Sequence, residues 1–263
     1  MKNSYFDLID QSYYFPQEGF DLKNNYLTFH GISLKYLIKK YGTPFKLVYL
    51  PRIGEQIRKA KNLFNRAIKK NGYRGNYNYC YCTKCCHFSH VIKTALNEGV
   101  HLETSSAFDI DLIFNLLEEG SLSKSTILVH NGYKTEDYLK KIIALNEAGF
   151  KNSILVLDSI SEIQRVKKVA SKYKGRLKIG IRIAIDEEPQ SAYYTSRLGI
   201  RPAEIMNFYK TEIESDDNLS MKMVHFFIDS GIKDSVYYWG EFQKALKIFV
   251  ELKKYAQQSK RLT

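Results

Sequence analysis

A regular alternation of apolar strands and amphipathic helices, from Tyr77 onward, constrains the fold more than any other feature of this sequence. Each repeat has an apolar run, a turn with polar residues and a helix-like segment. Three successive gaps between strand ends are nearly equal, as expected for alternating β and α units of fixed size. The predicted strands are Asn76–Lys84, Val100–Thr104, Thr126–Asn131, Ser153–Asp158, Leu177–Ile185 and Met221–Asp229.

The helices between these strands carry start and stop signals. Ser106 followed by Asp109 is a capping-box pattern before an apolar stripe, and Gly120 follows the stripe as a stop. Thr135 and Gly149 bound the next helix in the same way. These apolar stripes have helical spacing and therefore predict faces that pack against a core.

Six parallel strands joined by helical crossovers fit a doubly wound sheet or a (β/α) barrel. No strand is followed by the glycine-rich fingerprint of dinucleotide-binding sheets, so the barrel is favoured. A closed barrel of this type has eight units, and an open one exposes strand edges. We therefore expect a chain that is part of a longer barrel, or a barrel whose closure comes from elsewhere.

The first 50 residues differ from the rest. The sequence predicts two short strands around Asn24-Asn25, a helix over Leu34–Lys40 and a strand over Phe45–Leu50. We expect residues 1–50 to belong to a separate β element and residues 51–263 to form the partial barrel.

Composition restricts the location and the partners. The amino terminus has no apolar signal core, and no long charge-free apolar stretch is present, which predicts a cytoplasmic protein that does not enter the membrane. The formal net charge is +12, but the lysines are scattered over separate helical segments. Charge without a recognition motif is weak evidence for nucleic acid, and we expect no such partner.

All four cysteines lie between Cys80 and Cys86, with His87 and His90 close behind. A metal site is one reading, but the spacing lacks the two separated ligand pairs of a zinc knuckle. Small side chains lining a barrel strand explain Cys80 and Cys82 equally well. We therefore predict no metal and, in a cytoplasmic chain, no disulfide.

Lys84 ends the first predicted barrel strand, on the same strand face as Cys80 and Cys82. An amine at the end of a buried strand is costly unless it is used, and the carboxyl ends of barrel strands are where barrel enzymes carry their chemistry.

Five runs, in this order, resemble landmarks of the fold-type III pyridoxal-phosphate decarboxylases, the family of the ornithine, diaminopimelate and arginine enzymes. The Asn-Gly-Tyr-Lys run is most similar to the biosynthetic arginine decarboxylases. The runs are Tyr41-Gly42-Thr43-Pro44, Lys84 after its aromatic-rich strand, Asn131-Gly132-Tyr133-Lys134, Ser196-Arg197-Leu198-Gly199 and His225-Phe226-Phe227-Ile228-Asp229-Ser230-Gly231.

The resemblance implies an alanine-racemase-like TIM-type barrel that binds pyridoxal 5'-phosphate. Lys84 is then the lysine that forms a Schiff base with the cofactor, a role suited to an amine whose pKa falls readily. Ser230 matches a serine that hydrogen-bonds the cofactor phosphate. Glu103 matches an acid near the lysine, although a carboxylate that starts a helix is an equal alternative. Asp109 aligns with another acid of the family, but its capping role explains it fully.

Two further positions follow from the same resemblance. Arg182 belongs to the polar ring beneath the cofactor, and we expect it to pair with Glu103 because a buried guanidinium needs a partner. Phe227 stands where the family has a histidine that stacks on the pyridine ring. An aromatic face still stacks there, but it carries no charge or hydrogen bond. His225 retains the first histidine of that motif.

The resemblance also implies parts that this sequence does not contain: a Gly-Gly-Gly phosphate loop, an acid for the pyridine nitrogen and a C-terminal β domain. We therefore expect a truncated decarboxylase that converts arginine to agmatine in polyamine biosynthesis, forming a homodimer or larger homo-oligomer at full length. Ornithine or diaminopimelate as the substrate, and a non-catalytic regulatory protein of the same fold, remain the alternatives.

Overall fold

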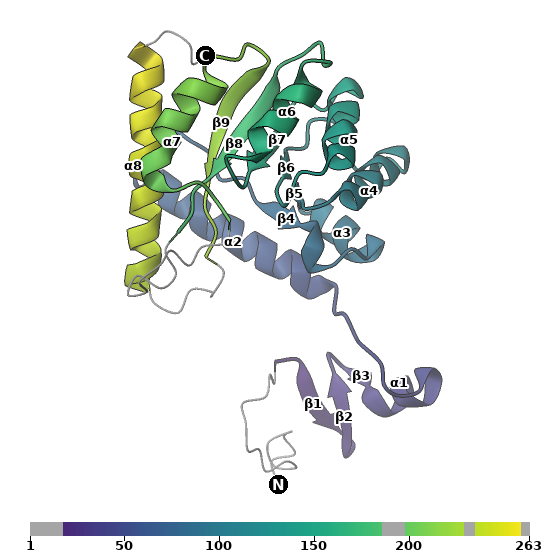
Figure 1. Cartoon of the computed structure of the whole chain (residues 1–263). Helices are drawn as coiled ribbons and strands as arrows, with labels where there is room; N and C mark the ends of the chain where they lie inside the picture. Colours follow the sequence, from purple (N-terminus) through teal and green to yellow (C-terminus); the bar gives the residue numbers. More distant parts are fainter. Residues whose placement is uncertain (1–17, 186–197, 229–234, 259–263) are drawn as a thin grey trace, which may run out of the picture. The chain divides into compact units, whose positions relative to one another are not determined.

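The computed structural model describes residues 18–185, 198–228 and 235–258 of the chain (Figure 1). The chain divides into two compact units, Met1–Tyr49 and Leu50–Thr263. Each unit is described by itself.

The first unit is a small antiparallel sheet with one helix. The strands pair in the order β1-β2-β3, and the helix follows the third strand directly. The elements are β1 (Phe20–Lys23), β2 (Tyr26–Phe29), β3 (Ile32–Ser33) and α1 (Leu34–Tyr41).

Local chemistry explains this unit. Asn24 and Asn25 both have a positive φ, 51° and 60°, which is the geometry of a tight hairpin turn that asparagine tolerates well. Ser33 caps α1 by accepting a hydrogen bond from the backbone N–H of Tyr36. The predicted hairpin and helix are confirmed, but the predicted strand over Phe45–Leu50 is wrong. Residues 45–49 have no regular structure, because they pair with no strand in the described part of the chain.

The second unit contains six parallel strands that neighbour one another in sequence order, β4-β5-β6-β7-β8-β9. A doubly wound sheet would reverse its strand order partway across, so this order confirms the predicted barrel winding. The strands are β4 (Cys80–Cys82), β5 (His101–Thr104), β6 (Leu128–His130), β7 (Ser153–Leu157), β8 (Leu177–Arg182) and β9 (Leu219–His225).

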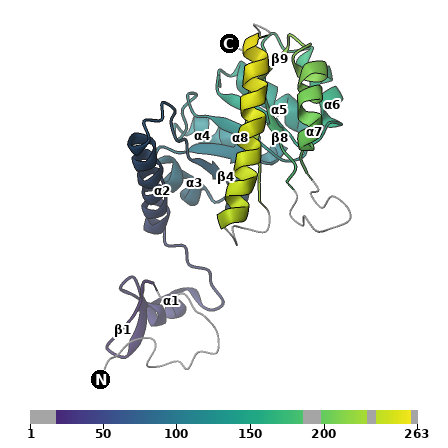
Figure 2. The ribbon, with the colours of Figure 1, turned by 90° about the vertical axis from the view of Figure 1, so that its left-hand side faces the viewer.

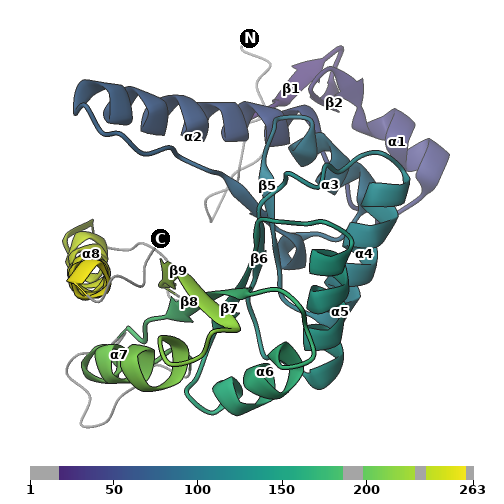
Figure 3. The same cartoon turned by 90° about the horizontal axis from the view of Figure 1, so that it is seen from above.

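Helices connect these strands. Seen from above, the strands follow a curve with the connecting helices on its outer side (Figure 3). At one end of the unit α7 and α8 lie side by side (Figure 2). The helices are α2 (Pro51–Lys70), α3 (Ser89–Leu96), α4 (Ala107–Glu118), α5 (Glu136–Glu147), α6 (Glu162–Ala170), α7 (Pro202–Phe208) and α8 (Ser235–Gln258).

The predicted helix starts are confirmed in detail. Ser106 and Asp109 form a reciprocal capping box at the start of α4, and the Thr135 hydroxyl accepts the N–H of Tyr138 at the start of α5. The apolar stripes of these helices pack against the strands, so that residues such as Leu102, Ile110 and Leu155 share one continuous core. Burial of these stripes is the main contribution that holds the strand ends in place.

The β8–β9 pair contains an irregularity that affects the strand ends. Ile179 pairs with Met221 and Gly180 with Met223, so Lys222 is the extra residue of a β-bulge. Beyond the bulge the register brings Arg182 opposite His225. Both residues were predicted inside longer strands, and they become direct neighbours at the observed ends of β8 and β9.

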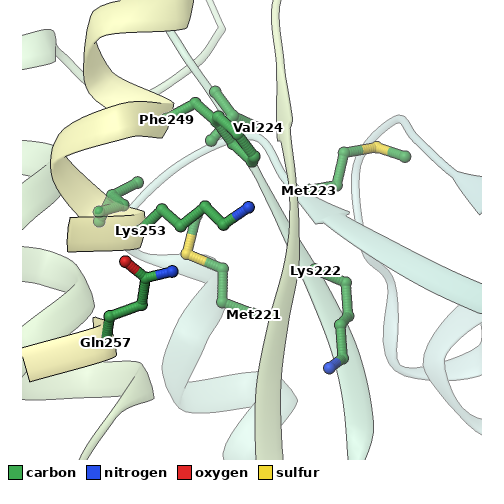
Figure 4. A pocket seen from close by; sticks show the side chains of 8 residues that line it. Met221, Lys222, Met223, Val224, Phe249, Lys253 and Gln257 are labelled. Carbon is green, nitrogen blue, oxygen red and sulfur yellow. The ribbon is translucent and has the colours of Figure 1, made fainter. Parts of the chain in front are cut away.

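β9 is an edge strand of this sheet, and α8 runs beside it. Between them lies a pocket of about 240 Å³ that is lined mainly by apolar groups. Figure 4 shows Met221 and Val224 on the side of α8, near Phe249 and Lys253, while Met223 points away from the helix. None of the lining residues is a predicted site residue, so this pocket is separate from the candidate site.

Candidate functional site

Lys84 lies just beyond β4, in a 3-10 turn formed by Thr83–Cys85. The predicted strand Asn76–Lys84 is therefore too long at both ends, since β4 itself covers only Cys80–Cys82. The turn forms because the buried Thr83 hydroxyl donates to the backbone carbonyl of Glu103, at 3.0 Å. As a result Lys84 is exposed. The expected buried strand is corrected: β4 is only partly buried, and the amine that follows it is exposed.

The Lys84 amine faces an aromatic ring. Its Nζ lies 5.4 Å from the centroid of the Phe227 ring, and the Arg182 guanidinium lies 5.4 Å from the same centroid. Phe227 comes two residues after the end of β9 and is 40% exposed. An aromatic face attracts cations at this range, so the ring, the lysine and the arginine form one group at the carboxyl ends of the strands.

Arg182 pairs with a different acid from the one predicted. Its Nη1 lies 3.6 Å from Oδ1 of Asp158. Within the described residues, the Glu103 carboxylate accepts hydrogen bonds from Cys82 and Asn131 instead. Asp158 directly follows β7 and is 3% exposed. Neighbouring strand ends explain the pairing, because β7 adjoins β8 whereas β5, which carries Glu103, does not.

Lys134 is a second amine close to this group, and sequence reasoning assigned it no role. Its side chain is fully buried, with Nζ donating to the carbonyl of Gly132 and lying 3.8 Å from Oδ2 of Asp158. Burial lowers the pKa of Lys134, although Glu162 and Asp158 oppose the shift. Asp158 thus stands between two cations, Lys134 and Arg182. The only sequence signal was the position of Lys134 in the Asn131–Lys134 run.

Glu162 fixes the loops that carry these charges. Its two carboxylate oxygens accept the backbone N–H of Lys134, at 2.9 Å, and that of Asp158, at 2.7 Å. The loop after β6 is also held by Gly132, whose φ is 76°. A Cβ on Gly132 would lie 2.5 Å from the carbonyl oxygen of Ser105, so only glycine fits this close approach to the loop after β5.

Glu103 lies at the carboxyl end of β5, opposite Cys82 in the register of β4 and β5. Its Oε1 accepts hydrogen bonds from the Cys82 thiol, at 3.5 Å, and from the Asn131 amide, at 3.3 Å. Burial, and then the Glu103 charge, raise the pKa of Cys80 to about 11 and that of Cys82 to about 12. These thiols remain protonated near neutral pH and are poor metal ligands in that state. In the described residues no three His, Cys, Asp or Glu side chains gather as a metal site.

Asp109 has the structural role that the sequence indicated. Its Oδ2 accepts the backbone N–H groups of Ser105 and Ser106 at the start of α4. Its Oδ1 lies 3.0 Å from Nε2 of His87, a contact that the sequence did not predict.

His225 completes the polar group at the strand ends. Burial, followed by the nearby charges of Arg182, Lys134 and Lys84, lowers its pKa to about 4, so it is neutral near pH 7. Its Nδ1 is buried and has no hydrogen-bond partner among the described residues. Ser230, the predicted phosphate ligand, lies outside the described residues, as do Ser196, Arg197 and Asp229.

These features fit a planar, aldehyde-bearing aromatic cofactor such as pyridoxal phosphate. The Lys84 amine is exposed and can react, and Phe227 supplies a partly exposed aromatic face. The buried, unpaired Nδ1 of His225 is a polar atom that a bound molecule could satisfy.

The fold and this arrangement define a barrel of the α/β type with a lysine at its carboxyl-end rim. Residues 52–263 match the family described as "Pyridoxal-dependent decarboxylase, pyridoxal binding domain". The chain belongs to this family, whose cofactor is pyridoxal phosphate, and the resemblance read from the sequence is confirmed.

Curated relatives agree with this assignment, and solved structures agree with the fold. The chain is 28% identical over 225 residues to the biosynthetic arginine decarboxylase of Prochlorococcus marinus strain MIT 9515, a match that covers 82% of this chain and 34% of the relative. Diaminopimelate decarboxylase from M. jannaschii, in complex with L-lysine, has a TM-score of 0.74 at 20% identity, over 91% of this chain and 54% of that one. The biosynthetic arginine decarboxylase from Campylobacter jejuni has a TM-score of 0.69 at 22% identity, over 94% and 41%.

This chain therefore spans about a third of the length of the curated relatives, with 34% and 36% covered in two of them. The structural likenesses show the fold alone. Within the described residues, every helix is too short or too polar to span a bilayer.

Proposed function

We propose that this chain is the cofactor-binding part of an enzyme that removes the α-carboxylate of arginine and yields agmatine, in polyamine biosynthesis. The observation that carries the proposal is the exposed Lys84 amine, 5.4 Å from the centre of the Phe227 ring, in a chain of the pyridoxal-dependent decarboxylase family. The names of the curated relatives support arginine as the substrate.

In this proposal each residue has a distinct task. Lys84 would hold the cofactor, because a primary amine is the side chain that bonds to an aldehyde. Phe227 would support the cofactor ring with its aromatic face, and Ser230 would donate its hydroxyl to the phosphate. Bound pyridoxal phosphate supplies an electron-poor ring that accepts the electron pair left when CO2 departs.

The surrounding charges keep this arrangement rigid. Asp158 holds Arg182 and Lys134 at the strand ends, and Glu162 holds the two loops behind them. Glu103 would place a negative charge near the cofactor held by Lys84, where it favours the protonated form of a nearby nitrogen. We further propose a cytoplasmic location and, in the whole protein, a homo-oligomer.

The test is cofactor uptake by the purified chain. Pyridoxal phosphate is added, the absorption band of lysine-bound cofactor is recorded, and borohydride reduction followed by mass spectrometry locates the attachment. We expect the label on Lys84 and no band in Lys84→Ala. The exposed Lys124 provides the matched control Lys124→Ala, which should bind normally. A Lys84→Ala chain that keeps the band would rule out the assignment.

Substrate choice has its own measurement. Addition of arginine, ornithine or diaminopimelate to the loaded protein should change the lysine-bound band when the amine of the amino acid displaces Lys84. The proposal is supported if arginine changes the band at a lower concentration than the other two amino acids do. If ornithine or diaminopimelate acts at a lower concentration, that amino acid replaces arginine as the proposed substrate.

A second candidate is a non-catalytic protein that regulates a complete decarboxylase. Phe227 favours it, because a phenyl ring at this position can neither donate a hydrogen bond nor carry a proton. Such a protein should change the elution of an active decarboxylase on size-exclusion chromatography. Unchanged elution in the mixture would remove this candidate.

A further inference from the structure

Asn131 is a buried residue at the end of β6, and its side-chain amide is held in one orientation. Its Oδ1 accepts the backbone N–H of Gly132 at 2.9 Å, so its Nδ2 must face the other way. In that direction Nδ2 donates to Oε1 of Glu103, at 3.3 Å. The side chain is 4% exposed and cannot exchange these contacts for water.

The backbone of Asn131 is fixed as firmly as its side chain. Its N–H donates to the carbonyl of Thr104 at 2.9 Å, and its carbonyl accepts the hydroxyl of Tyr138 at 3.3 Å. The Tyr138 hydroxyl also lies 2.7 Å from Oγ1 of Thr104, which lies 2.7 Å from Nδ1 of His130. The carboxyl ends of two neighbouring strands, β5 and β6, together with α5 therefore hold Asn131 in place.

This network keeps one charge state over the ordinary pH range. His130 is fully buried, with its Nε2 2.9 Å from the Ser153 hydroxyl, and burial lowers its pKa to about 3. Burial also raises the pKa of Tyr138. Both groups are neutral near pH 7, so the support behind Asn131 does not change with moderate changes in pH.

Glu103 depends on this support. In the described part of the chain its carboxylate receives two hydrogen bonds, from the Asn131 amide and from the Cys82 thiol, and both reach Oε1. A thiol is a weak donor, so the amide is the stronger of the two. With Oε1 held against the sheet, Oε2 remains available for a bound group.

We propose that Asn131 is a positioning residue, which holds Oε1 of Glu103 so that Oε2 is presented to the cofactor held by Lys84. This role rests on the proposed function, because it requires cofactor at Lys84. It extends the site to a residue that touches no reacting atom and acts only through Glu103.

The first test compares Asn131→Ala and Glu103→Gln with the natural chain. Affinity for pyridoxal phosphate is measured by titration of the lysine-bound band, and unfolding is measured separately with urea. We expect both variants to bind about tenfold more weakly, the scale of one lost hydrogen bond to a charged group. Asn152→Ala is the matched control, since Asn152 lies before β7, at the opposite end of the strands, and its affinity should not change.

Exchanging the amide and the carboxylate between positions 131 and 103 tests whether Asn131 positions Glu103 or only stabilises the fold. Asn131→Asp puts two carboxylates side by side and should weaken both stability and binding. Adding Glu103→Gln restores one amide and one carboxylate, with the charge moved to position 131. We expect this double variant to regain resistance to urea but to remain about tenfold weaker for the cofactor.

Each outcome decides the question. Natural affinity in Asn131→Ala, or recovery of both stability and affinity in the double variant, overturns the positioning role and leaves the proposed function intact. A natural chain that takes up no cofactor at Lys84 overturns the proposed function and this role with it.

Discussion

Lys84 follows β4 and Phe227 follows β9, the two edge strands of the six-stranded sheet, yet the Lys84 amine lies 5.4 Å from the centre of the Phe227 ring. In a flat sheet of this width the two residues would be separated by four intervening strands, each about 4.8 Å from the next. The curvature of the sheet therefore brings its edges together at the carboxyl ends, where the candidate site lies.

Phe227 should contribute to cofactor affinity through its aromatic face. We expect Phe227→Ala to weaken binding of pyridoxal phosphate about three- to tenfold, because stacked aromatic pairs contribute roughly 0.5–1.5 kcal/mol. Phe227→His should bind about as well as the natural chain, since an imidazole also stacks. Titration of the lysine-bound absorption band measures both, with Phe108→Ala as the control because Phe108 is 83% exposed on α4. Equal affinity in Phe227→Ala would contradict the stacking role.

Asp158 should be essential for stability. Asp158→Asn removes the carboxylate between Lys134 and Arg182 and leaves two cations near each other at the strand ends. Breaking a buried ion pair costs about 3–5 kcal/mol, and we expect a loss of this size in the free energy of unfolding measured with urea. Asp111→Asn is the control, because Asp111 is 54% exposed in its pair with Lys141 and should cost less than about 1 kcal/mol. A small effect at Asp158 would mean that the cluster is well hydrated.

Gly132 should tolerate no side chain. Gly132→Ala forces a left-handed backbone on alanine and puts its Cβ against the carbonyl oxygen of Ser105. Gly120 has a similar φ of 71° with open space around it, so Gly120→Ala should cost only the backbone strain, about 1–2 kcal/mol. We expect Gly132→Ala to cost about 1–3 kcal/mol more. Equal urea midpoints for the two variants would show that the two loops move apart without cost.

The stability of the chain should fall as the medium becomes acidic, partly because of His130. Its pKa in the folded state is about 3, below the value of 6.5 expected when unfolded, so the unfolded chain binds the extra proton between these values. This contribution is fully present above pH 6.5 and is lost as the pH falls toward 3, with a slope of about 1.4 kcal/mol per pH unit. His225, whose pKa is lowered to about 4, acts in the same direction.

His130→Asn should make the free energy of unfolding depend less steeply on pH. The variant lacks the titrating group, so its unfolding free energy between pH 7 and pH 5 should change less steeply than that of the natural chain, even if it is less stable throughout. Replacement of the exposed His90 by Gln is the control for loss of an imidazole. Parallel curves for His130→Asn and the natural chain would show that His130 has the same pKa in the folded and the unfolded chain.

Local signals in the sequence were reliable where neighbouring residues decide the structure. The Asn24-Asn25 turn and the Ser106 and Asp109 capping box form as predicted, because each depends on contacts within a few residues. A strand forms in each of the six apolar runs, but with different bounds: the run over Asn76–Lys84, for example, gives only Cys80–Cys82. The strand over Phe45–Leu50 did not form, since a strand needs a partner that the local sequence does not specify.

The sequence by itself determined the order of strands and helices and placed Lys84 and Glu103 at strand ends, because apolar periodicity, caps and turns are encoded locally. Only the tertiary structure decided which of these residues meet. The curvature of the sheet brings Lys84 close to Phe227. Because β7 and β8 are neighbours, Arg182 pairs with Asp158. The packing of the loops buries Lys134 and directs the Asn131 amide toward Glu103. Such contacts depend on the packing of the whole unit, and no short stretch of sequence contains that information.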